Sequence, residues 1–265
     1  MKTMRFLPLF LAAAAAVASA DTLRSAKVSQ AINQVTLYPE GSSARAAQTG
    51  DNISGSSSLQ TGRRSRAEIT FQDNTITRIG QNSVFSFHSG TRELELQQGS
   101  VLLQVPKNAG GAQIRTATVT AAITGTTTMF EYSPHQWVKL ITLEGCQKLF
   151  IKGHKKPVLV PAGQMIVMNP DGRVIPQPVI VDLARLMATS VLAGHHTFGP
   201  LPPRAITLIT QAIDQQKQDK RDGILLPTFF FGGSLPSQSD QGSLIARGLG
   251  HMESWSETYQ PPYNP

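Results

Sequence analysis

The stretch from Ala67 to Val105 reads AEITFQDNTITRIGQNSVFSFHSGTRELELQQGSVLLQV. Apolar and polar residues alternate along it, so that Ala67, Ile69 and Phe71 fall on one side of an extended chain and Glu68 falls on the other. Successive side chains of a β-strand point to opposite faces of its sheet. The alternation therefore predicts strands with one buried face.

The same pattern extends over residues 28–175, where strand-like runs alternate with turn residues. We predict turns at 73–74, 89–90, 98–99, 133–136 and 169–172, and a last short strand at Val174-Ile175. Five glycines are assigned to turns between strands, namely Gly50, Gly62, Gly99, Gly145 and Gly163. Four aromatic residues are expected in the core, namely Phe71, Phe85, Phe130 and Trp137. Many short strands at this spacing indicate a mainly β protein with a sandwich or roll of strands.

The pattern changes after Pro178, where we expect two short amphipathic helices packed on the β domain. Asp182 is placed to cap the first helix, which would run from Leu183 to about Ala193 and stop at Gly194. The second would begin near Pro203 and fade before Gly223. Its apolar side carries Ile206, Ile209, Ala212 and Ile213.

The two ends of the chain have distinct compositions. Lys2 and Arg5, an apolar run, and Ala18-Ser19-Ala20 have the order of a secretory signal peptide, with Asp21 as the first mature residue. The far end is rich in Gly, Ser, Pro and Gln, which is typical of disorder, although its Phe229-Phe230-Phe231 run should dock on the parent domain or on a partner. The expected organisation is a signal peptide at 1–20, a β domain at 21–178, helices at 179–223 and a tail at 224–265, partly docked and then disordered.

Charge and cysteine content exclude several classes of protein. Of 265 residues, 24 are Lys or Arg and 17 are Asp or Glu, and the basic residues are scattered without interleaved aromatics, so nucleic acid is not an expected partner. A single cysteine excludes a disulfide framework and a cysteine zinc cluster. No segment beyond the signal is long and apolar enough to span a membrane. These features predict a periplasmic or secreted protein.

Few residues suggest chemistry. His195-His196 is the most evident candidate for a metal, but adjacent side chains usually diverge, and the end of a helix also suits a basic group. Cys146 is either an exposed thiol able to pair between chains or a small buried residue. Asp51, Glu68 and Asp73 are explained by turns and strand surfaces. We therefore assign no catalytic, cofactor-binding or metal residues and expect no cofactor.

Eight short motifs, in this order and spacing, resemble the periplasmic β domain of the FecR family. They are GDNI (50–53), LQTG (59–62), RAEI (66–69), FQDNT (71–75), LELQQGSVLL (94–103), ITGTTTMF (123–130), LEG (143–145) and VPAGQ (160–164). Asn74 stands where the family has glycine, and 123–130 carries one inserted residue. The resemblance implies an all-β domain that binds rather than catalyses. The family's best-known members relay a signal through a cytoplasmic segment and a transmembrane helix, which this chain lacks once the signal is cleaved, so that role is not carried over.

Residues and resemblance together favour a non-enzymatic, exported binding module of the bacterial cell envelope. Its expected partner is a protein or an envelope polysaccharide, and its oligomeric state stays open. One alternative is an envelope hydrolase or glycan-processing enzyme whose site lies in loops. Another is a structural component of the envelope or cell surface.

Overall fold

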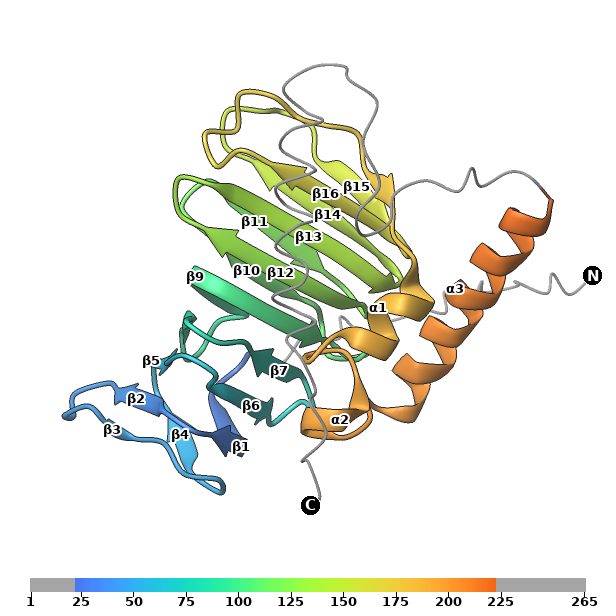
Figure 1. The fold of residues 1–265 in the computed structure, drawn as a ribbon. Coiled ribbons are helices and arrows are strands. Elements are labelled where there is room, and N and C mark those ends of the chain that lie inside the picture. The colour runs from blue at the N-terminus through green and yellow to red at the C-terminus, as the bar shows by residue number, and fades with distance from the viewer. Residues whose placement is uncertain (1–21, 223–265) are drawn as a thin grey trace, which may run out of the picture.

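The computed structural model describes residues 22–222. The expected signal peptide and the expected tail, including Phe229–Phe231, lie outside the described residues. The described part is mainly β, with many short strands followed by helices, as the sequence predicts (Figure 1). None of the helices within 22–222 is long and apolar enough to cross a bilayer.

The strands form two layers, and we call the layer against the helices the helix-side sheet. Its neighbouring strands pair antiparallel. Its order is β4 (Asn52–Ser54), β1 (Ser25–Ile32), β6 (Arg66–Phe71), β7 (Ile76–Ile79), the second half of β9 (Glu93–Gln104), β12 (Thr127–Ser133), β13 (Trp137–Glu144), β16 (Gln164–Met168) and β17 (Val179–Ile180).

We call the second layer the open sheet, because no described helix covers its outer face. Its order is β3 (Arg45–Ala46), β2 (Val35–Pro39), β5 (Ser57–Thr61), β8 (Val84–Phe87), the first half of β9, β10 (Ala112–Arg115), β11 (Val119–Ile123), β14 (Cys146–Ile151) and β15 (Val158–Pro161). Within residues 22–222, the pairing of β9 with β10 is parallel and the others are antiparallel.

Strand β9 belongs to both layers and joins them. Its first half pairs with β8, and its second half pairs with β7 and β12. The register with β8 shifts near Gln98, which marks a β-bulge, and Gly99 follows with a φ of 94°. A Cβ at Gly99 would collide with Ser83. The predicted turn at 98–99 is therefore wrong: the chain bends within one continuous strand rather than reversing.

The main core lies between the two sheets. The inward-facing residues of β6, Ala67, Ile69 and Phe71, are buried there, as the alternation predicts. Phe85 and Phe130 are fully buried in the same core, so these assignments are confirmed. The expected strand at Val174-Ile175 does not form, since those residues belong to an irregular segment.

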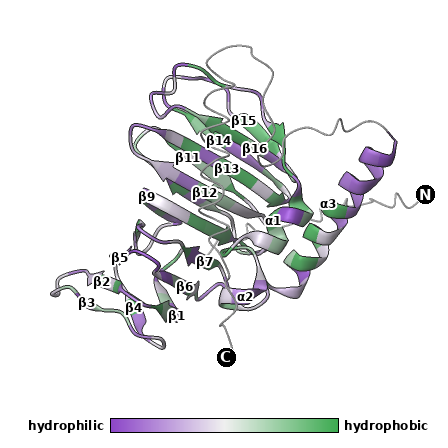
Figure 2. Cartoon of the chain, in the orientation of Figure 1, coloured by the Kyte–Doolittle hydropathy of each residue, from purple (hydrophilic) through white to green (hydrophobic). Residues whose placement is uncertain are grey.

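Within the described part of the chain there are three helices rather than the two expected, and they lie together on one side of the sandwich (Figure 1). They are α1 (Leu183–Thr189), α2 (His195–Phe198) and α3 (Pro203–Arg221). Asp182 caps α1 as predicted, because its side chain accepts the N–H of Arg185 at 2.9 Å. Figure 2 shows hydrophobic residues along the first turns of α3 and hydrophilic residues at its C-terminal end.

A second core fills the space between the helices and the helix-side sheet. Leu183, Leu186 and Ile209 of the helices pack there against Ile141 and Leu143 of the sheet. Every residue of β13 is buried, because one face of that strand meets the main core and the other meets the helices. Trp137 is buried as expected, but in this second core. Strand β17 begins at Val179 and pairs with β16, so the sheet continues into the segment expected to be helical.

Candidate functional site

Two buried charges face each other on the helix-side sheet beneath the helices. Because Ala67 and Ile69 point into the main core, Glu68 points to the opposite face of β6. Arg78 lies directly across from Glu68 on β7, and its Nε donates to Glu68 Oε2 at 2.8 Å. Arg78 is 1% exposed and Glu68 8%. Glu68 was expected at a strand surface, and this expectation is wrong because the helices cover that face.

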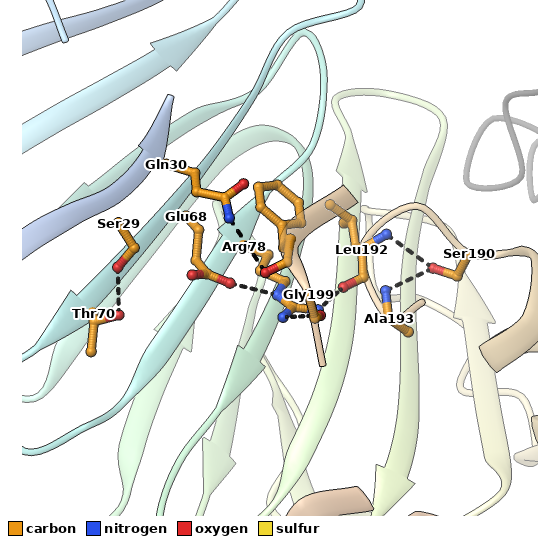
Figure 3. A network of polar contacts seen from close by, with 10 residues as sticks. Ser29, Gln30, Glu68, Thr70, Arg78, Ser190, Leu192, Ala193 and Gly199 are labelled. Atoms are coloured by element: carbon orange, nitrogen blue, oxygen red, sulfur yellow. Dashed lines mark hydrogen bonds and ion pairs between the residues drawn. The ribbon is translucent and has the colours of Figure 1, made fainter. Parts of the chain in front are cut away.

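The two terminal nitrogens of Arg78 donate hydrogen bonds to the helical segment (Figure 3). It donates to the carbonyl oxygen of Leu192 at 2.8 Å and to that of Gly199 at 2.9 Å. Its guanidinium also lies 5.2 Å from the ring centre of Phe198. Burial lowers the pKa of Arg78, while Glu68 opposes the shift, and arginine stays charged in proteins. The side chain therefore ties the segment around α2 to the sheet.

A second buried pair lies on the same face, between β12 and β13. Lys139, with no exposed surface, donates to Glu131 at 2.9 Å, and the indole N–H of Trp137 donates to the other oxygen of Glu131 at 2.9 Å. Burial lowers the pKa of Lys139, and the Glu131 carboxylate opposes this shift. Both oxygens of Glu131 thus have internal donors, an arrangement that holds the strands and Trp137 together.

Two cavities open beside these elements. The first, of about 280 Å³, is lined by Arg66, Ser100, Glu131, Trp137 and Leu192 among others. It lies between the ends of β7 and β12, the bulge in the middle of β9 and the chain after α1. The second, of about 190 Å³, lies against the first turns of α3. Its wall includes the buried side chains of Gln104 and Glu144 and the exposed residues Lys107 and Arg204.

The outer face of the open sheet carries exposed apolar side chains. Phe150 on β14 is 45% exposed and Leu159 on β15 is 55% exposed. Leu159 lies opposite Lys148, two residues from Phe150, so the two apolar residues are diagonal neighbours across adjacent strands. Lys148, which lies next to both, is itself exposed. This face therefore combines apolar surface with positive charge.

Cys146 lies on the same strand, β14, and is exposed. Of the two alternatives for this residue, the small buried residue is wrong and the exposed thiol fits the structure. The side chain points outward because Gln147 and Leu149, the next positions of opposite parity, point into the protein.

His195 and His196 form the first turn of α2, not the end of the preceding helix. Helix α1 stops at Thr189, because the Ser190 hydroxyl accepts the N–H groups of Leu192 and Ala193 at 3.3 and 3.1 Å and starts a turn. The two imidazole rings do not diverge as expected, since their centres lie 4.1 Å apart. Within residues 22–222, no three His, Cys, Asp or Glu side chains gather as they would around a metal ion.

The other acidic candidates lie in turns, as expected. Asp51 accepts from Arg45 at 2.6 Å and from the N–H of Gln48 at 2.8 Å, and these hydrogen bonds lower the pKa of Asp51. Asp73 accepts from Arg92 at 2.6 Å. Arg78 and Lys139 were missed by the sequence interpretation. For Lys139 a signal was available, because its neighbours in sequence, Val138 and Leu140, are buried apolar residues, whereas Arg78 follows Thr77 and gave no such signal.

The central strands of both sheets, β5 through β13, fall in the segment that a family model matches. That model is described as FecR protein, and it matches residues 57–145. Residues 57–145 are thus similar to the FecR family. The resemblance found in the sequence is thus confirmed over this range, while the flanking motifs at 50–53 and 160–164 and the three helices lie outside it.

Two crystal structures of candidate anti-sigma factors from Parabacteroides distasonis ATCC 8503 are similar to the chain. The one at 2.50 Å resolution has 11% identity and a TM-score of 0.44, and the match covers 51% of this chain and 65% of that one, just under two thirds. The one at 1.65 Å has 13% identity and a TM-score of 0.45, with 60% and 74% covered. No curated protein matches the chain.

Proposed function

We propose that the protein is an exported, non-enzymatic binding module of the cell envelope, and that the open sheet receives a protein partner. The observation that carries this proposal is the contrast between the two outer faces of the sandwich. The chain's own helices cover one face, with a second core and the Arg78 hydrogen bonds beneath them. The other face leaves Phe150 and Leu159 exposed.

An exposed apolar pair on an uncovered sheet face is better suited to contact with a protein than to contact with water. Apolar residues that gather on an exposed face mark interaction sites more often than scattered single residues do. Lys148, next to both, adds charge that can select an acidic partner and speed its approach. These features favour a protein over a neutral polysaccharide, which remains the alternative partner.

The two buried ion pairs are built for structure rather than for catalysis. Glu68, Arg78, Glu131 and Lys139 satisfy one another or the backbone, and a general acid or base must instead reach a substrate. The FecR match points the same way, because the resemblance implies a domain that binds. Export is supported by the signal-like pattern of residues 1–20.

Site-specific crosslinking tests this proposal. A photoreactive amino acid replaces Lys148 on the open sheet or, as the control, Lys217 on the exposed side of α3. Irradiation in intact cells should give a discrete, protease-sensitive adduct from position 148 and none from position 217. A protease-resistant adduct would favour the glycan alternative.

Equal adducts from both positions, or none from either, would contradict binding through the open sheet. Incubation of the mature protein with purified envelope glycan should release no soluble fragments. Release of such fragments would overturn the non-enzymatic assignment.

A further inference from the structure

The C-terminal end of α3 lies beside the corner at which the two sheets meet. Strands β15 and β16 belong to different sheets and are joined by a short turn at Ala162-Gly163. Near the end of α3, the side-chain amide of Gln216 donates to the carbonyl oxygen of Val181 at 2.8 Å and to that of Gly163 at 3.4 Å. Helix α3 then ends at Arg221 (Figure 1). The chain therefore leaves α3 close to β15, the last strand of the open sheet.

Exposed side chains follow this turn on the outer face of the open sheet. Pro161 is exposed on β15, directly opposite Cys146 on β14. Leu159 and Phe150 lie further from the turn on the same two strands and point the same way, because alternate residues of a strand share a face. We call Cys146, Phe150, Leu159 and Pro161 the corner patch. A chain that comes from α3 passes Pro161 and Cys146 before it reaches Leu159 and Phe150.

The sequence directly after the described residues has a composition that matches this patch. Residues 224–231 read ILLPTFFF and carry no charged side chain. Residues 232–265 carry three acidic residues and one arginine. The open sheet offers the opposite charge, with Lys152, Lys155 and Lys156 exposed in the loop after β14. The apolar run thus matches the apolar patch, and the charges of the two parts are complementary.

The apolar run is also long enough to reach the patch. About 9 Å of helix separates Gln216 from Asp222. About 13 Å of chain separates Gly163 from Leu159 on β15. Residues 223–231 span about 30 Å when extended, which covers both stretches and the side-chain contact that links them. The end of the run can therefore lie over the corner patch.

We infer that residues 224–231 fold back over the corner patch and cover it until a partner displaces them. The inference rests on the proposed function, because it names the segment that occupies the binding face before the partner arrives. Contact between the run and the patch removes apolar surface of both from water. Because the segment belongs to the same chain, it is held at a high effective concentration near the patch. The apparent affinity of every partner falls with the fraction of uncovered chains, so the segment acts against weak binders.

The thiol of Cys146 reports on the cover, because it belongs to the chain's single cysteine and lies in the corner patch. The measurement is the rate at which a bulky maleimide alkylates this thiol in the full mature chain. The variant that combines Phe229→Ser, Phe230→Ser and Phe231→Ser should react at least about threefold faster than the parent, because only uncovered molecules react.

A matched control removes apolar residues further along the tail. The variant that combines Leu244→Ser and Ile245→Ser should react at the rate of the parent. Equal rates for the parent and the triple phenylalanine variant would overturn the inference. So would protection of Cys146 that disappears on dilution, because a second copy of the chain would then be the occupant.

The cover and the proposed function fail separately. Rapid alkylation of Cys146 in the parent, with a partner still captured at position 148, overturns the cover alone. Protection of Cys146 by the phenylalanine run, with no partner captured even from the triple variant, overturns the proposed function and leaves the cover standing.

Discussion

The Arg78 hydrogen bonds predict a large and specific cost when this side chain is replaced. Arg78→Met leaves the Glu68 carboxylate buried without its cation, which typically costs about 3–5 kcal/mol. It also removes the donor from the buried carbonyl of Leu192, at a further cost of about 1 kcal/mol. We therefore expect the free energy of unfolding to fall by about 4–6 kcal/mol. Adding Glu68→Gln removes the unpaired buried charge, so the double variant should recover at least about 2 kcal/mol of that loss.

Urea unfolding of the mature chain, followed by circular dichroism, measures these differences. Arg115→Met is the matched control, because Arg115 also pairs across strands, with Glu93 at 2.6 Å, but is 49% exposed. Its loss should stay within about 0.5 kcal/mol. The role assigned to Arg78 is refuted if Arg78→Met costs no more than Arg115→Met, or if Glu68→Gln fails to relieve it.

Four further outcomes are expected. Intact-mass analysis of exported protein should show a chain that begins at Asp21, and a retained signal segment would contradict this. In urea unfolding, Phe130→Ala should cost about 3–5 kcal/mol because the side chain is fully buried, whereas Phe150→Ala should cost under about 1 kcal/mol; equal losses would mean that the faces are misassigned. Because burial raises the folded-state pKa of Glu144 above its ordinary 4.5, its ionisation lowers stability as the pH rises from about 4.5. Glu144→Gln should therefore stabilise the chain more at pH 7.5 than at pH 4, and a difference independent of pH would refute this. Limited digestion with a protease of broad specificity should cut first within residues 232–247, given their composition, and a first cut before residue 224 would show instead that the phenylalanine run leaves with the tail.

The sandwich could be predicted from the sequence because strand alternation reports burial directly. Ala67, Ile69 and Phe71 share the main core as their spacing requires, and Asp182 caps α1 through its own side chain. Gly99 was misassigned to a turn, since a glycine at positive φ serves a bulge inside a strand as well as a reversal.

Glu68 and Arg78 could not be assigned from the same pattern. Alternation states which face of a strand a residue occupies, but not what covers that face. The cover comes from the carbonyl groups of Leu192 and Gly199, more than a hundred residues further along the chain. The cavity beside α3 could not be predicted for the same reason, because its wall combines Gln104 with a helix far away in sequence.

The most direct test of the binding face uses a chain in which Phe150 and Leu159 are both replaced by serine. The measurement is the Kd between this double variant and the partner protein captured by crosslinking at position 148. The account predicts that the double variant folds as the parent does, because both side chains are exposed, and that the partner's Kd rises by about tenfold or more. An unchanged Kd, together with weaker binding when exposed residues of α3 are replaced, would place the partner on the helices and contradict the account.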